Sequence, residues 1–288
     1  MRSDSSTPRH HFTVDVEEYF QVGALERFVD RASWERIPSR IEVGMRRVLD
    51  LLEAHGVQGT FFVLGWVAKY HPALVREIVN RGHEVASHGW GHERVTTLSL
   101  EQFRASVRDS KRALEDLCGS PVLGYRAPSF SIVRGMEWAL DILIEEGYRY
   151  DSSLFPVRRS GYGFVGGARD PHRIAREGGT IDELPPATIR VGSAVLPAGG
   201  GAYFRLFPYD VVRRAFIHAE RRGVPATFYI HPWELDPDQP RLHVPLKTRV
   251  QHYGRLRSTE HRLARFLGEF RFQTMAETLD LRQVAATG

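Results

Sequence analysis

Apolar and polar residues alternate along this chain with two different periods. Short apolar runs such as TFFV, and runs that alternate at every second residue such as FTVDV, are typical of β-strands. Longer segments repeat their apolar residues every three or four positions, which is typical of amphipathic helices. The pattern predicts strands over residues 11–16, 59–65, 83–88, 122–128, 148–154 and 226–232, and helices over residues 39–56, 73–82, 99–119, 135–147, 209–223 and 261–270. Residues 271–279 are predicted to close the chain as a strand that passes into a short helix.

Strand–helix alternation over the whole length predicts a parallel sheet. We therefore expect an α/β fold, a distorted (β/α) barrel of about seven parallel strands, forming one domain over residues 11–288 after a disordered tail at residues 1–10. Residues 158–179 are rich in glycine and arginine, break the alternation and are predicted to be a loop that covers the active site. Residues 181–189 and 193–207 are predicted to be extended.

Composition excludes several classes of function. The 288 residues carry a formal net charge of +4, and all but three of the 39 basic residues are arginines scattered among acids. Because there is no basic block or zinc-finger spacing, nucleic acid is not an expected partner. The single cysteine, Cys118, permits no internal disulfide and suits a reducing compartment. The sequence contains no run of about 18 apolar residues, so no membrane-spanning helix is expected.

The expected location follows from the amino-terminal residues, which are polar and lack the apolar core of a signal peptide. We expect a cytoplasmic protein. Contact with the inner face of the membrane through an arginine-rich helix such as HRLARFLGEF is left open.

Acidic side chains stand at the end of the first predicted strand, TVDVEEYF. Side chains alternate across a strand, so Asp15 and Glu17 share one face, whereas Val14, Val16 and Glu18 share the other. Two buried acids that lie close together need a cation or a proton to compensate them. The alternative is a pair of solvated acids in a loop.

Imidazoles and a guanidinium stand at other strand ends. His88 and His92 lie four residues apart within SHGWGH, Arg126 lies in GYRAPS, and His231 lies in YIHPWE. Taken alone, His88 and His92 also fit a surface turn. Because parallel strands bring their carboxyl ends to one mouth of a barrel, we expect these groups to meet. Two imidazoles and a carboxylate supply the three protein ligands of a hydrolytic Zn²⁺ site and leave a position for water.

The four motifs TVDVEEYF, SHGWGH, GYRAPS and YIHPWE, in this order, resemble those of the polysaccharide deacetylase family of carbohydrate esterases. The resemblance covers roughly residues 11–232. LPAGGGAYFRLFP and HPWELDPDQPR resemble the branch associated with bacterial exopolysaccharide and exosortase gene clusters. The resemblance implies a metal-dependent hydrolase that removes N-acetyl groups from N-acetylhexosamine units of an exopolysaccharide or its lipid-linked precursor.

The resemblance also implies roles for single residues. Asp15 matches the catalytic base, His88 and His92 match the metal ligands, Arg126 matches the arginine that pairs with the base, and His231 matches the general acid. The backbone N–H near Ser129 matches the donor to the oxyanion. Trp90 and Trp233 are candidate walls for a sugar ring or the acetyl group, the alternative being that both pack the barrel rim.

One position departs from the family pattern. The common motif has two adjacent aspartates, of which the second binds the metal, and Val16 stands there in this chain. We assign the third ligand to Glu17, with Glu18 as the fallback. Asp151 is the candidate for the carboxylate that orients His231.

Two other functions remain open. One is an amide hydrolase of the same fold that acts on a cyclic amide or a formyl group. The other is an inactive carbohydrate-binding relative.

Overall fold

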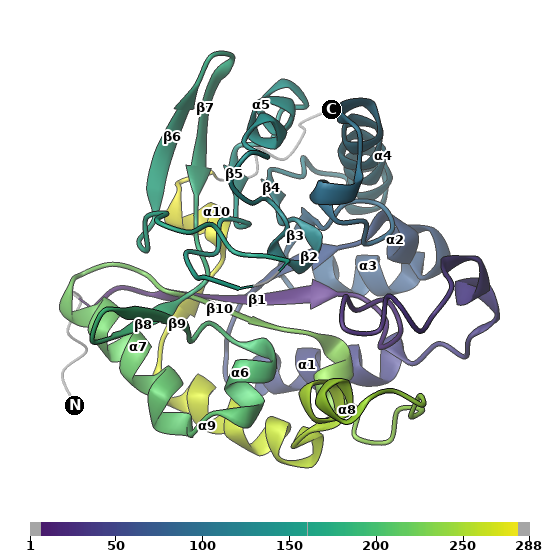
Figure 1. The fold of residues 1–288 in the computed structure, drawn as a ribbon, viewed down its shortest axis with the longest axis vertical. Helices are drawn as coiled ribbons and strands as arrows, with labels where there is room; N and C mark the ends of the chain where they lie inside the picture. The colour runs from purple at the N-terminus through teal and green to yellow at the C-terminus, as the bar shows by residue number, and fades with distance from the viewer. Residues whose placement is uncertain (1–6, 160, 282–288) are drawn as a thin grey trace.

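The computed structural model describes residues 7–159 and 161–281. Its centre is one curled sheet with the strand order β10-β1-β2-β3-β4-β5-β7-β6, and β11 adds to β1 (Figure 1). Neighbouring strands on this path are parallel except β6 with β7, so the seven strands from β10 to β7 form a parallel sheet as predicted. The strands are β1 (His10–Val16), β2 (Thr60–Val63), β3 (Glu84–Ser87), β4 (Gly124–Tyr125), β5 (Tyr150–Asp151), β6 (His172–Arg176), β7 (Gly179–Glu183), β10 (Thr227–Ile230) and β11 (Phe272–Gln273).

The two edges of the parallel sheet approach each other. Isolated parallel bridges join Pro186 to Thr227 and Gly200 to Tyr229, so the chain that follows β7 returns to β10. A separate hairpin of β8 (Thr188–Val191) and β9 (Ala194–Pro197) lies in sequence between the bridged residues Pro186 and Gly200. The distorted α/β barrel is confirmed, and its edges meet through single bridges in place of a continuous ladder.

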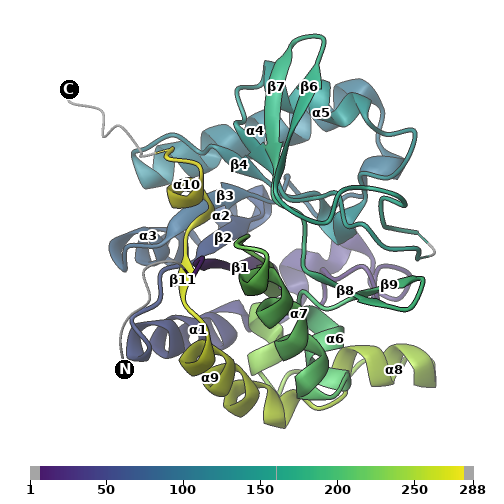
Figure 2. The ribbon, with the colours of Figure 1, turned by 90° about the vertical axis from the view of Figure 1, so that its left-hand side faces the viewer.

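Helices cover the outside of the curled sheet (Figures 1 and 2). They are α1 (Ile41–Ala54), α2 (Gly65–Tyr70), α3 (Pro72–Asn80), α4 (Leu100–Cys118), α5 (Trp138–Glu145), α6 (Gly201–Leu206), α7 (Tyr209–Arg221), α8 (Leu246–Tyr253), α9 (Thr259–Glu269) and α10 (Met275–Thr278). The alternation in β1 explains the layers: Phe12, Val14 and Val16 join the core under the helices, whereas Thr13 and Asp15 face Arg126 inside the barrel.

The start of α4 agrees with its sequence signals. Ser99 accepts a hydrogen bond from the backbone N–H of Gln102 at 3.2 Å, and the Gln102 side chain accepts one from the N–H of Ser99 at 2.9 Å. Gly119 ends the helix in the left-handed region, with φ 65°. The helix predicted over residues 99–119 is therefore confirmed, and a capping box lies at its start.

Two predicted segments differ from the structure. Part of the expected cover loop 158–179 is β6, which pairs with β7 and carries an ion pair between Arg173 and Asp182 at 2.9 Å. The expected extended stretch 193–207 becomes helical in α6. Gly200 makes that turn possible, because a Cβ at this residue would lie 1.7 Å from the backbone oxygen of Tyr229.

Further differences lie at the ends of other segments. Helices α2 and α8 are not predicted by the pattern, since both are short and their apolar residues make few repeats. The predicted tail at residues 1–10 mostly lies outside the described residues, and His10 already belongs to β1, where its side chain is buried. No helix in the described part of the chain is both long enough and apolar enough to cross a bilayer.

Candidate metal centre and active site

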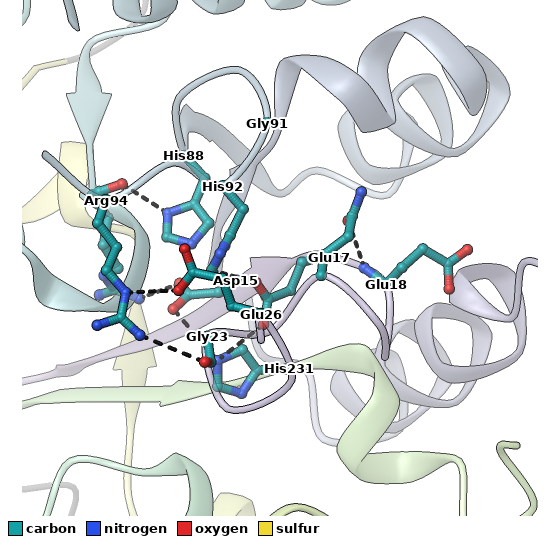
Figure 3. Close-up of polar contacts among 12 residues, drawn as sticks. Asp15, Glu17, Glu18, Gly23, Glu26, His88, Gly91, His92, Arg94 and His231 are labelled. Carbon is teal, nitrogen blue, oxygen red and sulfur yellow. Dashed lines mark hydrogen bonds and ion pairs between the residues drawn. The ribbon is translucent and has the colours of Figure 1, made fainter. Parts of the chain in front are cut away.

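Three side chains converge beyond the ends of β1 and β3. Glu17 follows β1, His88 follows β3, and His92 lies four residues later (Figure 3). One ligand atom of each lies within 4.8 Å of the others, and all three residues are buried. His92 Nε2 is 2.7 Å from Glu17 Oε2. The structure therefore brings together the three residues that the sequence assigned to a metal.

The turn between the two histidines has an unusual backbone. Gly89 has φ 75° and His92 has φ 60°, so two left-handed residues bend the segment within one short loop. The two imidazole rings consequently lie 5.5 Å apart, at an angle of 68°. Arg31 holds the loop from outside by donating to the backbone oxygen of His92 at 3.0 Å and to Glu93 at 2.6 Å. A left-handed residue other than glycine is strained, and such strain is found at functional sites.

His88 has the tautomer that a metal ligand needs. Its Nδ1 lies 2.7 Å from the backbone oxygen of Arg126 and donates to it, which directs the lone pair of Nε2 toward the cluster. Burial lowers the pKa of His88 to about 4, although the charges of Asp15 and Glu17 oppose this shift. The ring is therefore neutral at pH 7.

Glu17 supplies a buried anionic oxygen. Burial by itself raises the pKa of Glu17, but the charges of His92, His231 and His88 and the hydrogen bond with His92 bring the pKa down to about 2. Oε1 accepts a hydrogen bond from Trp233 Nε1 at 3.4 Å, and Oε2 is buried and lies 2.7 Å from His92 Nε2. A buried carboxylate oxygen beside two imidazoles is the donor set of a divalent cation.

Glu18 points away from this centre (Figure 3). Its carboxylate accepts hydrogen bonds from the Ser39 hydroxyl and from the backbone N–H of Arg40, which leads into α1. Glu18 thus serves the start of α1, and Glu17 is the acid beside the histidines.

Asp15 lies deep in the barrel mouth and is paired with Arg126. Arg126 Nη1 donates to Asp15 Oδ1 at 2.6 Å and to the Thr13 hydroxyl at 2.7 Å, and Nη2 donates to the Ser152 hydroxyl at 2.9 Å. The guanidinium is fully buried and stacks 4.1 Å from the ring centre of Phe62. This agrees with the sequence, which assigned Arg126 as the partner of Asp15.

His231 lies on the other side of the carboxylates. Its Nε2 is 3.8 Å from Asp15 Oδ2 and 3.6 Å from Glu17 Oε1, while its Nδ1 is 2.7 Å from Glu234 Oε1. Burial opposes protonation of His231, but the hydrogen bond with Glu234 and the charges of Glu17, Glu234 and Asp15 raise its pKa to about 9.

The expectation for Asp151 is wrong. Asp151 accepts a hydrogen bond from the Ser153 hydroxyl and shares a buried pair with Glu183, its partner across β5 and β7. The carboxylate that contacts His231 is Glu234, which is itself paired with the buried guanidinium of Arg205 on α6. Sequence reasoning missed both residues. Glu234 was detectable because it stands three positions after His231, whereas Arg205 had no local signal.

Trp233 is not a free wall for a sugar. Its indole is 8% exposed and stacks between the rings of His231 and His252, at centroid distances of 5.1 and 4.2 Å. Through its Nε1 it holds Glu17. Trp90 is half-buried, and its ring lies against Gly65 at the start of α2. Its contact with substrate stays a prediction.

Ser129 follows the end of β4 and has an unusual backbone. Ser129 and Phe130 are consecutive left-handed residues, with φ 55° and 51°. Two such residues in a row form a strained turn, and backbone strain of this kind is found at functional sites. The oxyanion role of the N–H near Ser129 stays a prediction.

Comparisons with known proteins divide the chain in two. Residues 34–149 match the family model described as polysaccharide deacetylase, and residues 152–280 match one described as a domain of unknown function (DUF3473). A chitooligosaccharide deacetylase of Rhizobium leguminosarum bv. trifolii is 38% identical over 153 residues, which are 52% of this chain and 62% of that protein. A peptidoglycan deacetylase of Helicobacter pylori is 31% identical over 115 residues, 39% of this chain and 38% of that protein. The chain thus spans less than two thirds of the length of these relatives.

Solved structures agree on the fold. A Mycobacterium smegmatis protein assigned as a polysaccharide deacetylase superposes with a TM-score of 0.65 at 24% identity and covers 98% of this chain and 92% of that one. The PuuE allantoinase superposes with a TM-score of 0.61 at 17% identity and covers 95% and 90%. Both likenesses concern the fold alone. Over residues 34–149 the chain is thus similar to the polysaccharide deacetylase family, and the homologous deacetylases match it over about half of its length.

Proposed function

We propose that this protein is a metal-dependent hydrolase that removes N-acetyl groups from N-acetylhexosamine units of a bacterial exopolysaccharide or its lipid-linked precursor. One observation carries the proposal: three donor atoms of Glu17, His88 and His92 lie within 4.8 Å of one another. Asp15 and His231 stand beside them, with His231 Nε2 3.8 Å from Asp15 Oδ2. A hydrolase of this kind needs a cation site, a base and an acid in one mouth.

Glu17, His88 and His92 would hold the metal. Two imidazoles and one carboxylate favour Zn²⁺ among the common divalent ions. When bound, such a cation supplies Lewis-acid polarisation and a lowered pKa for water. The residues present fit it, because His88 offers its neutral Nε2 and Glu17 offers a buried carboxylate oxygen within 4.8 Å of both imidazoles.

The chain's own residues supply the proton transfers. Asp15 takes the proton of the attacking water, and its pairing with Arg126 keeps it oriented toward the mouth. The acetamide C–N bond then breaks, and His231 Nε2 donates a proton to the departing nitrogen, which leaves as an amine beside acetate. Glu234 accepts from Nδ1 and so keeps the Nε2 of His231 directed inward. The backbone N–H near Ser129 is the proposed second donor to the oxyanion.

The intact set of groups supports catalysis over a purely carbohydrate-binding role. Acid, base and three ligands are all present, although Val16 replaces the usual second aspartate. The alternative function, hydrolysis of a cyclic amide, is supported only by the fold that this chain shares with PuuE allantoinase.

The decisive experiment measures acetate release from N-acetylated chitooligosaccharides and from an N-acetylated polysaccharide. We expect activity that a chelator abolishes and Zn²⁺ restores. The Asp15→Asn variant should lose about 10²- to 10⁴-fold in kcat and keep its metal. Allantoin, tested in parallel, should not be hydrolysed. Activity that survives complete metal removal, or Asp15→Asn turning over like the parent, would overturn the proposal.

A further inference from the structure

The segment around α8 is unusually basic. Residues 239–259 contain five arginines or lysines and no acidic residue, in a chain in which basic and acidic residues are otherwise mixed. All five cationic side chains lie on residues that are exposed: Arg241, Lys247, Arg249, Arg255 and Arg257. Glu260, which follows the segment, is paired with Arg47. The positive charge of this surface is therefore not balanced within its own segment.

The same helix exposes apolar side chains. Leu246 is 75% exposed and Val250 is 50% exposed, and Leu246 is more exposed than any other large apolar residue in the described ranges. The two residues are four positions apart, so they lie on one face of α8. Lys247 and Arg249 stand between them in sequence. We call Leu246, Lys247, Arg249 and Val250 the α8 surface.

The α8 surface is rigidly attached near the mouth of the barrel. Tyr253, at the end of α8, packs in one apolar cluster with Trp233 and with Tyr19, which follows β1. Arg205 donates to the backbone oxygens of Gln251 and Gly254. In Figure 1, α8 lies at the lower edge of the molecule, and in Figure 2 it projects from the body. The α8 surface is therefore held in a fixed position relative to the segment that carries Trp233.

The helix that the sequence singled out for membrane contact does not have such a surface. In α9 the apolar residues Leu263, Phe266 and Leu267 are buried in the core, and Arg265 is paired with Glu269 at 2.8 Å. The arginine-rich helix HRLARFLGEF is therefore a core helix. The combination of cations and exposed aliphatic side chains is found instead on α8.

We propose that the α8 surface docks onto an anionic lipid bilayer. Lipid phosphates attract Lys247 and Arg249, and the interface between headgroups and acyl chains takes up Leu246 and Val250. An anionic polysaccharide would use the same cations, but it offers no apolar phase for two aliphatic side chains. The exposed leucine and valine thus favour the bilayer. The inference concerns binding alone and stands whether or not the proposed hydrolysis is correct.

Vesicle sedimentation with the full chain tests the proposal. We expect binding to vesicles that contain phosphatidylglycerol, weak binding to pure phosphatidylcholine, and loss of binding at high salt. Lys247→Gln with Arg249→Gln should weaken binding about 30-fold, since each surface cation contributes roughly fivefold. Leu246→Ser with Val250→Ser should weaken it roughly 10-fold or more. Val191→Ser, which changes another exposed apolar residue (56% exposed) on the β8–β9 hairpin, is the matched control and should bind like the parent.

Binding of dextran sulfate, a soluble polyanion, tests the alternative that α8 binds an anionic polysaccharide and not a bilayer. If the Leu246/Val250 double variant binds phosphatidylglycerol vesicles as tightly as the parent, or if the parent binds dextran sulfate but no vesicle, the bilayer proposal is overturned and α8 is a polyanion site. Equal binding to both kinds of vesicle, or none to either, also overturns it. Retained unfolding temperatures of the variants show that the loss does not come from misfolding.

Discussion

Glu17 and Glu18 are adjacent in sequence and nevertheless serve different parts of the molecule. Their side chains leave the end of β1 on opposite faces, as strand alternation requires. Glu17 meets two imidazoles, whereas Glu18 meets the backbone that leads into α1. The chemistry of a carboxylate here depends on which face it takes.

This contrast makes a matched pair of variants informative. Glu17→Gln should lower the affinity for Zn²⁺ at least 100-fold, because it replaces an anionic ligand by a neutral amide. Glu18→Gln should bind Zn²⁺ like the parent and lose about 1 kcal/mol of stability, because it weakens an acceptor of the N–H that opens α1. Titration calorimetry and thermal unfolding measure the two effects. Equal Zn²⁺ affinities of both variants would contradict the assignment of Glu17.

Glu234 links His231 to the buried Arg205, so its role is positioning. Glu234→Gln should lower kcat about 10- to 100-fold while leaving KM and the metal content nearly unchanged. Glu234→Asp should recover part of the loss. Glu260→Gln, which alters an exposed partner of Arg47, is the control. If kcat and KM both stayed at parent values in Glu234→Gln, Glu234 would have no role in placing the acid.

At the scale of elements, the site depends on how closely α1 approaches the segment after β10. A Cβ at Gly44 of α1 would lie 2.1 Å from the backbone oxygen of Pro232, the residue that follows His231. Backbone cannot yield as a flexible side chain can. The absence of a side chain at Gly44 therefore lets α1 support the segment that carries the proposed acid.

Two glycine-to-alanine changes separate packing from helix propensity. A Cβ at Gly268 of α9 would meet no atom of the described residues within 4 Å, so Gly268→Ala should stabilise the protein by about 0.5–1 kcal/mol. Gly44→Ala should destabilise it by about 1–3 kcal/mol despite the same propensity gain, because it overpacks α1 against Pro232. Chemical denaturation measures both. A stabilised Gly44→Ala variant would show that this contact is not tight.

At the scale of the whole molecule, the two segments matched by different family models share one sheet and one site. His88, His92 and Arg126 lie within residues 34–149, whereas His231 and Glu234 lie within residues 152–280. The buried pair of Asp151 and Glu183 joins β5 to β7 across this division. We therefore propose that the two segments form one domain, as the sequence predicted.

The Asp151–Glu183 pair makes global stability depend on pH. Burial raises the pKa of Asp151 to about 6 and that of Glu183 well above its usual value, the charge of Asp151 adding to the latter. The folded state then holds more protons than the unfolded state, so this contribution is complete below about pH 4 and is lost as pH rises through about 6. Glu183→Gln removes one titrating member. Relative to this variant, the parent should lose unfolding free energy between pH 4 and pH 8.

Denaturation at several pH values checks this. Asp182→Asn is the control. Asp182 is adjacent to Glu183 in sequence, but its carboxylate pairs with Arg173 on the surface. The expectation fails if the difference between parent and Glu183→Gln does not change with pH.

Much of the fold was predictable because its signals are local. The apolar periods placed the long helices and most of the strands, and α4 begins where its apolar period predicted. The short helices α2, α6 and α8 were missed, since glycine contacts and tertiary packing select them. At the site, the residues at strand ends were predictable because a parallel barrel collects them. The partner of His231 was not, because Asp151 and Glu234 both stand near a strand end and only packing separates them.

The sequence by itself determined the strand–helix order and the faces of Asp15 and Glu17, because periodicity is a property of neighbouring residues. The roles proposed for acid, base and ligands came from the resemblance to a known family. Only the tertiary structure decided that Glu234 and Arg205 hold His231, that Trp233 is buried between two imidazoles, and that α8 presents the exposed apolar face. These depend on contacts between segments far apart in the chain, and no local pattern encodes which of several suitable side chains will meet.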